Sequence, residues 1–186
     1  MLNKQNKIII IAGIIAITIV VFGVVVWWQV DLNDKTIVPA AVPAEKPDQK
    51  ITAADAYVLA LAKAKEWDPV AKLSKINSAA ENTSSQGKAD SWELLYTSEN
   101  KTGLAYRVNI ADKSIVDSAE VPFYGAGGEL PQNLLTSEEA ISRVRQISGY
   151  ENEPIISVEM IYDAPAKLWF WGVKTGKGTI TVNAQK

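Results

Sequence analysis

The chain contains neither cysteine nor histidine among its 186 residues. These absences exclude disulfide bonds, Cys/His zinc sites, cysteine nucleophiles, and Ser-His-Asp or Cys-His catalytic machinery. They also exclude a histidine pH switch. No paired carboxylates, phosphate-binding loop or calcium-loop pattern takes their place. We therefore predict a protein that is not an enzyme, with no catalytic residues, no cofactor and no metal.

Basic residues are scarce relative to what nucleic-acid binding needs. The net charge is −2, and the first 30 residues contain Lys4 and Lys7 but no acid. The remaining residues are therefore net acidic. An acidic domain binds the phosphate backbone poorly, so we expect no nucleic-acid partner.

Charge is missing altogether from residues 8–28, which are almost entirely apolar. At 1.5 Å per residue, a helix of this length spans roughly 30 Å, the thickness of a bilayer core. We predict a single transmembrane helix over 8–28, with Lys4, Lys7, Trp27 and Trp28 at the membrane interfaces. A cleaved signal peptide is the alternative, but its apolar region is usually about 7–15 residues. No Ala-x-Ala site follows this run.

The charges that flank the run predict its orientation. Lys4 and Lys7 precede it, whereas Asp31 and Asp34 follow it. The positive-inside rule then places residues 1–7 in the cytoplasm and everything after residue 28 outside the cell membrane. We expect a single-pass protein whose bilayer contact is this segment. Residues 29–50, with Pro39, Pro43 and Pro47, are interpreted as a semi-rigid stalk or a plain linker.

Two helices are predicted from their starting signals and apolar spacing. Thr52 and Asp55 form a loose capping box before a stripe that ends ahead of Pro69. Thr136 and Glu139 form a full capping box, and we expect that helix to end at Gly149.

Strands are predicted where the apolar period changes to two. The runs lie at 72–77, 92–97, 104–110, 115–121, 155–162, 168–175 and 179–184. The order is thus helix, strands, helix, strands. We predict an α+β fold with two helix-plus-antiparallel-meander units, 51–122 and 136–186, joined by a connector over 123–135. The two units either share one sheet or pack side by side.

One predicted strand is apolar on both faces. Leu168 and Phe170 alternate with Trp169, Trp171 and Val173. One face must cover a helix, and the other is either buried by the neighbouring unit or left as a contact patch. Trp169, Trp171 and Val173 are therefore the candidate partner contacts.

The second half resembles PepSY-type domains. The resemblance rests on Thr136-Ser-Glu-Glu-Ala-Ile, the Gly149-Tyr150 pair, Trp171-Gly-Val-Lys-Thr and the final Gly178-Thr-Ile-Thr-Val run. The first half looks like a divergent copy. The whole arrangement is similar to TseB-like regulators of cell-wall elongation. This resemblance implies a non-enzymatic module that binds or restrains an envelope protein, either a peptidase or a cell-wall synthase. A structural stalk or a subunit of a surface complex is the alternative, and an exported enzyme is a third class.

Overall fold

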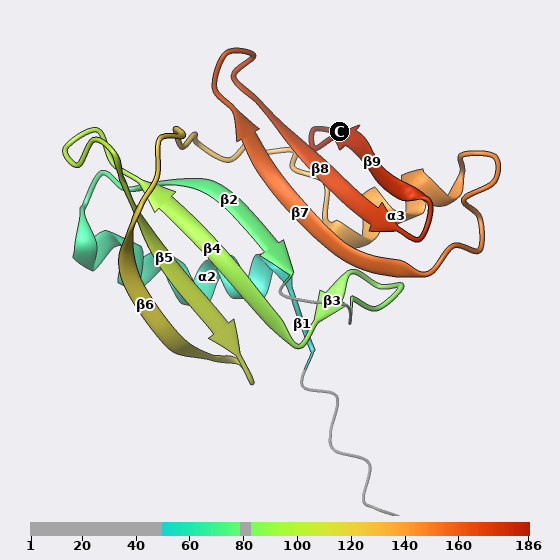
Figure 1. The fold of residues 1–186 in the computed structure, drawn as a ribbon, viewed down its shortest axis with the longest axis horizontal. Coiled ribbons are helices and arrows are strands. Elements are labelled where there is room, and N and C mark those ends of the chain that lie inside the picture. The colour runs from blue at the N-terminus through green and yellow to red at the C-terminus, as the bar shows by residue number, and fades with distance from the viewer. Residues whose placement is uncertain (1–49, 79–82) are drawn as a thin grey trace, which may run out of the picture. The chain divides into compact units, whose positions relative to one another are not determined.

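The computed structural model describes residues 50–78 and 83–186 of the chain. Figure 1 shows the arrangement of the elements in these ranges. In chain order they are β1 (Ile51–Thr52), α2 (Ala53–Trp67), β2 (Lys72–Ser78), β3 (Lys88–Ala89), β4 (Ser91–Thr97), β5 (Leu104–Ala111), β6 (Ser114–Pro122), α3 (Ser137–Arg145), β7 (Ile155–Asp163), β8 (Leu168–Thr175) and β9 (Gly178–Asn183).

Seven of the strands form one antiparallel sheet in the order β6-β5-β4-β2-β7-β8-β9. The link between the two halves is the pairing of β2 with β7, which sets Lys75–Asn77 opposite Ile161–Glu159. Ser78 extends this junction through its side chain. Its hydroxyl accepts from the Val158 N–H at 2.9 Å and donates to the Val158 carbonyl at 3.2 Å.

The predicted fold class, an α+β fold of two helix-plus-antiparallel-meander units, is therefore wrong. The described residues form mostly antiparallel sheet, with two short helices of 15 and 9 residues. The pairing of β2 with β7 merges the strands of both halves. Neither described helix is long and apolar enough to span a membrane. The segments predicted as cytoplasmic (1–7) and transmembrane (8–28) lie outside the described residues, and so does the predicted stalk (29–50) apart from Lys50.

Local signals determine where the helices begin. Thr52 and Asp55 form the expected capping box of α2, and Thr136 and Glu139 form that of α3. The end of α3 differs from the prediction. The helix stops at Arg145 with Gln146 as its cap, and Gly149 lies in the following turn with φ of +88°.

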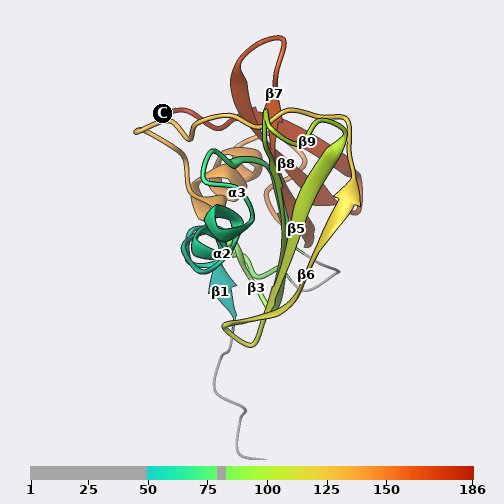
Figure 2. The same ribbon diagram turned by 90° about the vertical axis from the view of Figure 1, so that its left-hand side faces the viewer.

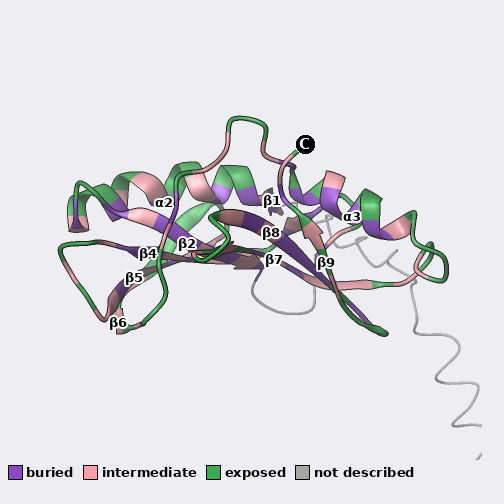
Figure 3. Ribbon diagram, turned by 90° about the horizontal axis from the view of Figure 1, so that it is seen from above, coloured by how far each residue is buried: buried purple, intermediate pink, exposed green. Residues whose placement is uncertain are grey.

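Both helices cover the same face of the sheet, as Figures 2 and 3 show. Four buried alanines let α2 approach the strands closely: Ala53, Ala56, Ala60 and Ala64. The largest fully buried side chains beneath the helices are Trp92, Trp169, Trp171 and Tyr96. The opposite face of the sheet is more polar and contains the ion pairs Lys75–Glu159 (2.9 Å) and Arg107–Asp117 (3.0 Å).

Candidate functional site

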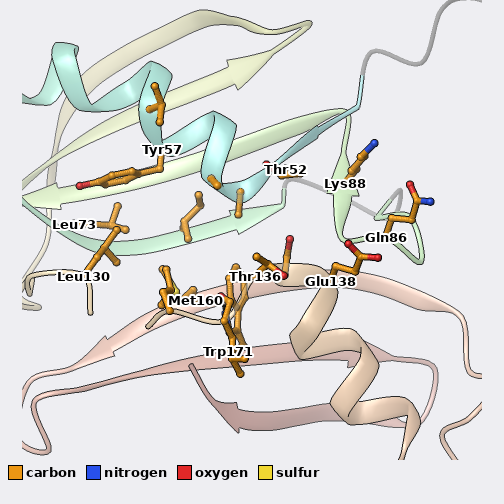
Figure 4. Close-up of a pocket in the computed structure, with 17 residues that line it drawn as sticks. Thr52, Tyr57, Leu73, Gln86, Lys88, Leu130, Thr136, Glu138, Met160 and Trp171 are labelled. Atoms are coloured by element: carbon orange, nitrogen blue, oxygen red, sulfur yellow. Dashed lines mark hydrogen bonds between the residues drawn. The ribbon is translucent and has the colours of Figure 1, made fainter. Parts of the chain in front are cut away.

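A cavity of about 520 Å³ lies on the helix-covered face, above the junction of β2 and β7. This volume falls within the range of about 300–1,000 Å³ that is common for ligand sites. Figure 4 shows its lining residues, which come from both halves of the chain. They are Thr52, Ala53, Ala54, Tyr57, Val58, Leu73, Ile76, Gln86, Lys88, Leu130, Leu134, Leu135, Thr136, Ser137, Glu138, Met160 and Trp171.

The floor of the cavity is apolar and belongs to the core. Leu73 and Ile76 come from β2, Met160 from β7 and Trp171 from β8, and all four are buried in the core. The Trp171 indole N–H donates to the Leu135 carbonyl at 3.0 Å. That hydrogen bond holds the segment 130–138 against the sheet as one wall of the cavity.

The opposite wall is the first two turns of α2. Ala54 and Val58 line it, and Val58 is 70% exposed. Val58 therefore adds exposed apolar surface to the wall of the cavity. The wall is held in place at its start, where β1 pairs with β3 and the Trp92 indole N–H donates to the Ile51 carbonyl at 3.0 Å.

The rim at the helix starts is polar. Figure 4 shows Gln86, Lys88 and Glu138 at this end of the cavity. The backbone at the rim requires glycine at position 87, because its φ of +68° lies in the left-handed region. A Cβ at this position would lie 2.6 Å from Ser137 Oγ and 2.7 Å from Glu138 N. Ser137 Oγ in turn donates to the Gly87 carbonyl at 2.8 Å.

Lys88 and Glu138 are available to a ligand. Within residues 50–78 and 83–186, neither side chain belongs to an ion pair. An apolar floor beneath a rim with one cation and one anion suits an apolar group that carries polar atoms at one end.

The tyrosines beside the cavity stay neutral. Burial, assisted by Glu129, raises the pKa of the Tyr57 phenol, and burial likewise raises that of Tyr96 far above its usual range. The two rings stack at 6.5 Å between centroids. The buried Tyr96 hydroxyl has no hydrogen-bond partner in the described part of the chain. These phenols therefore contribute packing surface and carry no negative charge at neutral pH.

The structure places Trp169, Trp171 and Val173 in the core, with exposures of 1%, 1% and 0%. Their face is covered by the connector and α3, which favours burial over the contact patch. Trp171 nevertheless lines the cavity. The predicted membrane-interface residues Lys4, Lys7, Trp27 and Trp28 lie outside the described residues.

Sequence reasoning missed the cavity as a whole. Val58 and the leucines at 130, 134 and 135 are apolar lining residues that the sequence does show. None of them indicates a cavity by itself, because the cavity forms only when β2 pairs with β7.

Two of the partly buried acids have structural partners. Glu159 pairs with Lys75, and Glu139 caps α3. Among the described residues, no group of three or more acids could hold a metal ion.

A solved structure with a similar fold is that of a Clostridium difficile 630 protein described as a "putative lipoprotein". The match has a TM-score of 0.50 at 12% identity and covers 70% of this chain and 86% of that one. At this identity the likeness concerns the fold. No family model matches the chain, and no curated protein matches it significantly.

Proposed function

We propose that this chain is a membrane-attached, extracytoplasmic binding module whose cavity receives an apolar segment of an envelope protein. The observation that carries the proposal is the cavity between α2 and the segment 130–138. Its floor is apolar, and its rim carries Lys88 and Glu138 outside any ion pair of the described residues. The proposal assigns no catalytic step to any residue.

The proposed location rests on sequence and on the fold comparison. A similar fold in the protein described as a "putative lipoprotein" supports a place at the cell envelope. This chain has no cysteine to carry a lipid, so we assign membrane attachment to the uncharged run 8–28. Lys4 and Lys7 before that run favour a cytoplasmic N-terminus and an outward-facing domain.

The proposed partner class rests on the PepSY-like sequence pattern. Modules of that type bind or restrain other envelope proteins, so the pattern favours a peptidase or a cell-wall synthase as the partner. Apolar side chains of such a protein would cover Val58 and the cavity floor, and polar atoms at the end of the segment would meet the rim.

Site-specific photocrosslinking in intact cells tests this proposal. A photoreactive amino acid replaces Val58 at the cavity wall, and in a matched control it replaces Lys174, which is exposed on the opposite face of the sheet. We expect a crosslink to an envelope protein from position 58 and none from position 174. Equal crosslinking from both positions, or none from position 58, contradicts the proposal.

A further inference from the structure

The two free edges of the seven-stranded sheet differ in how well they are protected. An edge strand presents unpaired backbone groups that can pair with another chain, and proteins usually block them with charges, proline or bulges. β6 forms one edge of the described sheet and β9 forms the other.

β6 carries several of these protective features. Its register shifts opposite Asn109 and Ile110, so the strand has a bulge. It also contains Asp117 and Glu120, with no basic residue, and ends at Pro122. Two copies of β6 would bring like charges together, which destabilises pairing.

β9 lacks such features. Its six residues, Gly178–Asn183, contain no charge and no proline, and its pairing with β8 has no register shift. Four of the six residues are β-branched, which suits extended backbone. The lysines beyond its ends are already paired, Lys177 with Glu153 at 2.9 Å and Lys186 with Glu139 at 2.6 Å.

The pairing with β8 determines which backbone groups of β9 remain free. The Ala184 N–H donates to the Trp169 carbonyl at 2.8 Å, so Ala184 directs its N–H toward β8. Antiparallel ladders alternate, so Val182 and Ile180 do the same. The N–H and C=O groups of Thr179, Thr181 and Asn183 therefore point away from the sheet. These three residues are exposed.

We propose that a second copy of this chain pairs with β9, antiparallel and about a two-fold axis at Thr181. A two-fold interface must be self-complementary, and an uncharged strand meets its own copy without like-charge repulsion. In this register Thr181 faces its counterpart, and Thr179 faces Asn183 of the second copy. All three outward-pointing residues are then paired, and the two sheets become continuous.

Single cysteines test the register, because the natural chain has none. The full chain, purified in mild detergent, carries Thr181→Cys, Thr179→Cys or, on the other edge, Val116→Cys, where the native side chain is 58% exposed. Under mild oxidation we expect Thr181→Cys to run at twice its mass. Two copies of residue 179 would lie roughly 13 Å apart along the strands, beyond the about 7 Å Cα limit for a disulfide. Thr179→Cys and Val116→Cys should therefore stay monomeric.

A double variant confirms the register without relying on a single position. Thr179→Cys combined with Asn183→Cys should form the covalent dimer that neither substitution forms alone. Equal dimer from Thr181→Cys and Val116→Cys would show chance collision and overturn the proposal. Failure of both Thr181→Cys and the double variant to dimerise, or capture of a different protein by β9, would overturn it as well.

Discussion

Three buried tryptophans each form a hydrogen bond that joins an irregular segment of this domain to its sheet. The indole N–H groups of Trp92, Trp169 and Trp171 donate to the carbonyls of Ile51, Glu129 and Leu135, at 3.0, 2.9 and 3.0 Å. Each side chain thus supplies core volume and one hydrogen bond to a segment that crosses the helix-covered face. Alternation in the sequence predicts the face on which Trp169 and Trp171 lie. Alternation cannot show that connector residues cover that face, because the connector and β8 lie about 40 positions apart in the sequence.

Trp169 gives a prediction about stability. Trp169→Ala should lower the free energy of unfolding by about 3–5 kcal/mol, because it removes a large buried side chain. Trp169→Phe keeps most of the volume and loses the hydrogen bond to Glu129, so its loss should be smaller. Urea unfolding of a fragment spanning residues 50–186 measures both. Equal, small losses for the two variants would mean that Trp169 is not core.

Glu139 gives a prediction about acid stability. The hydrogen bond from Lys186, followed by that from the Thr136 N–H, lowers the pKa of this carboxyl from 4.5 to about 2. Because the folded-state value is the lower one, its stabilising effect is present above about pH 4.5. That effect is lost as the pH falls toward 2. Glu139→Gln should therefore lower the unfolding midpoint at pH 6 and have little effect near pH 2. A midpoint difference that does not change with pH would contradict this account.

At the scale of elements, the connector between the halves is held against β2 by defined hydrogen bonds, as a strand is held by its neighbour. The Gly128 N–H donates to the Leu73 carbonyl at 2.9 Å, and Ser74 Oγ donates to the Ala126 carbonyl at 2.8 Å. Sequence analysis identified both helix starts, because capping boxes are local. It misplaced the end of α3 at Gly149, because a glycine in a later turn looks the same in sequence as a helix-terminating one.

Gly127 tests the fit of the connector. A Cβ at this position would lie 2.5 Å from the Lys72 carbonyl oxygen and 2.7 Å from that of Leu73, and backbone cannot easily move aside. Gly127→Ala should cost about 1–3 kcal/mol through overpacking. Gly176→Ala is the matched control, since its Cβ would come no closer than 3.6 Å to Glu153. Similar unfolding midpoints for the two variants would refute this close packing.

At the scale of the whole molecule, the decisive contact is the pairing of β2 with β7. It joins residues about 80 positions apart, as the bond between Ser78 and Val158 illustrates. The apolar pattern of each strand predicts that it will pair, but it does not identify the neighbour. For this reason the sequence left a shared sheet and side-by-side units equally open, and the cavity above the junction could not be foreseen.

A shared sheet predicts how the domain unfolds. The fragment 50–186 contains every described strand and both helices, so it should unfold in one cooperative transition. Fluorescence of the tryptophans and far-UV circular dichroism should report the same midpoint on heating. Two separated transitions would show that the halves are independent units.

The central claim, that the cavity binds a partner, is tested most directly by filling it. Ala54 is exposed at the cavity wall on α2, whereas Ala62 is exposed on the same helix away from the cavity. Both positions accept a larger side chain on the helix surface, so the two variants should fold alike. We predict that Ala54→Trp abolishes the crosslink from position 58 to an envelope protein in intact cells and that Ala62→Trp preserves it. Retention of the crosslink in Ala54→Trp at the level of Ala62→Trp would contradict the account.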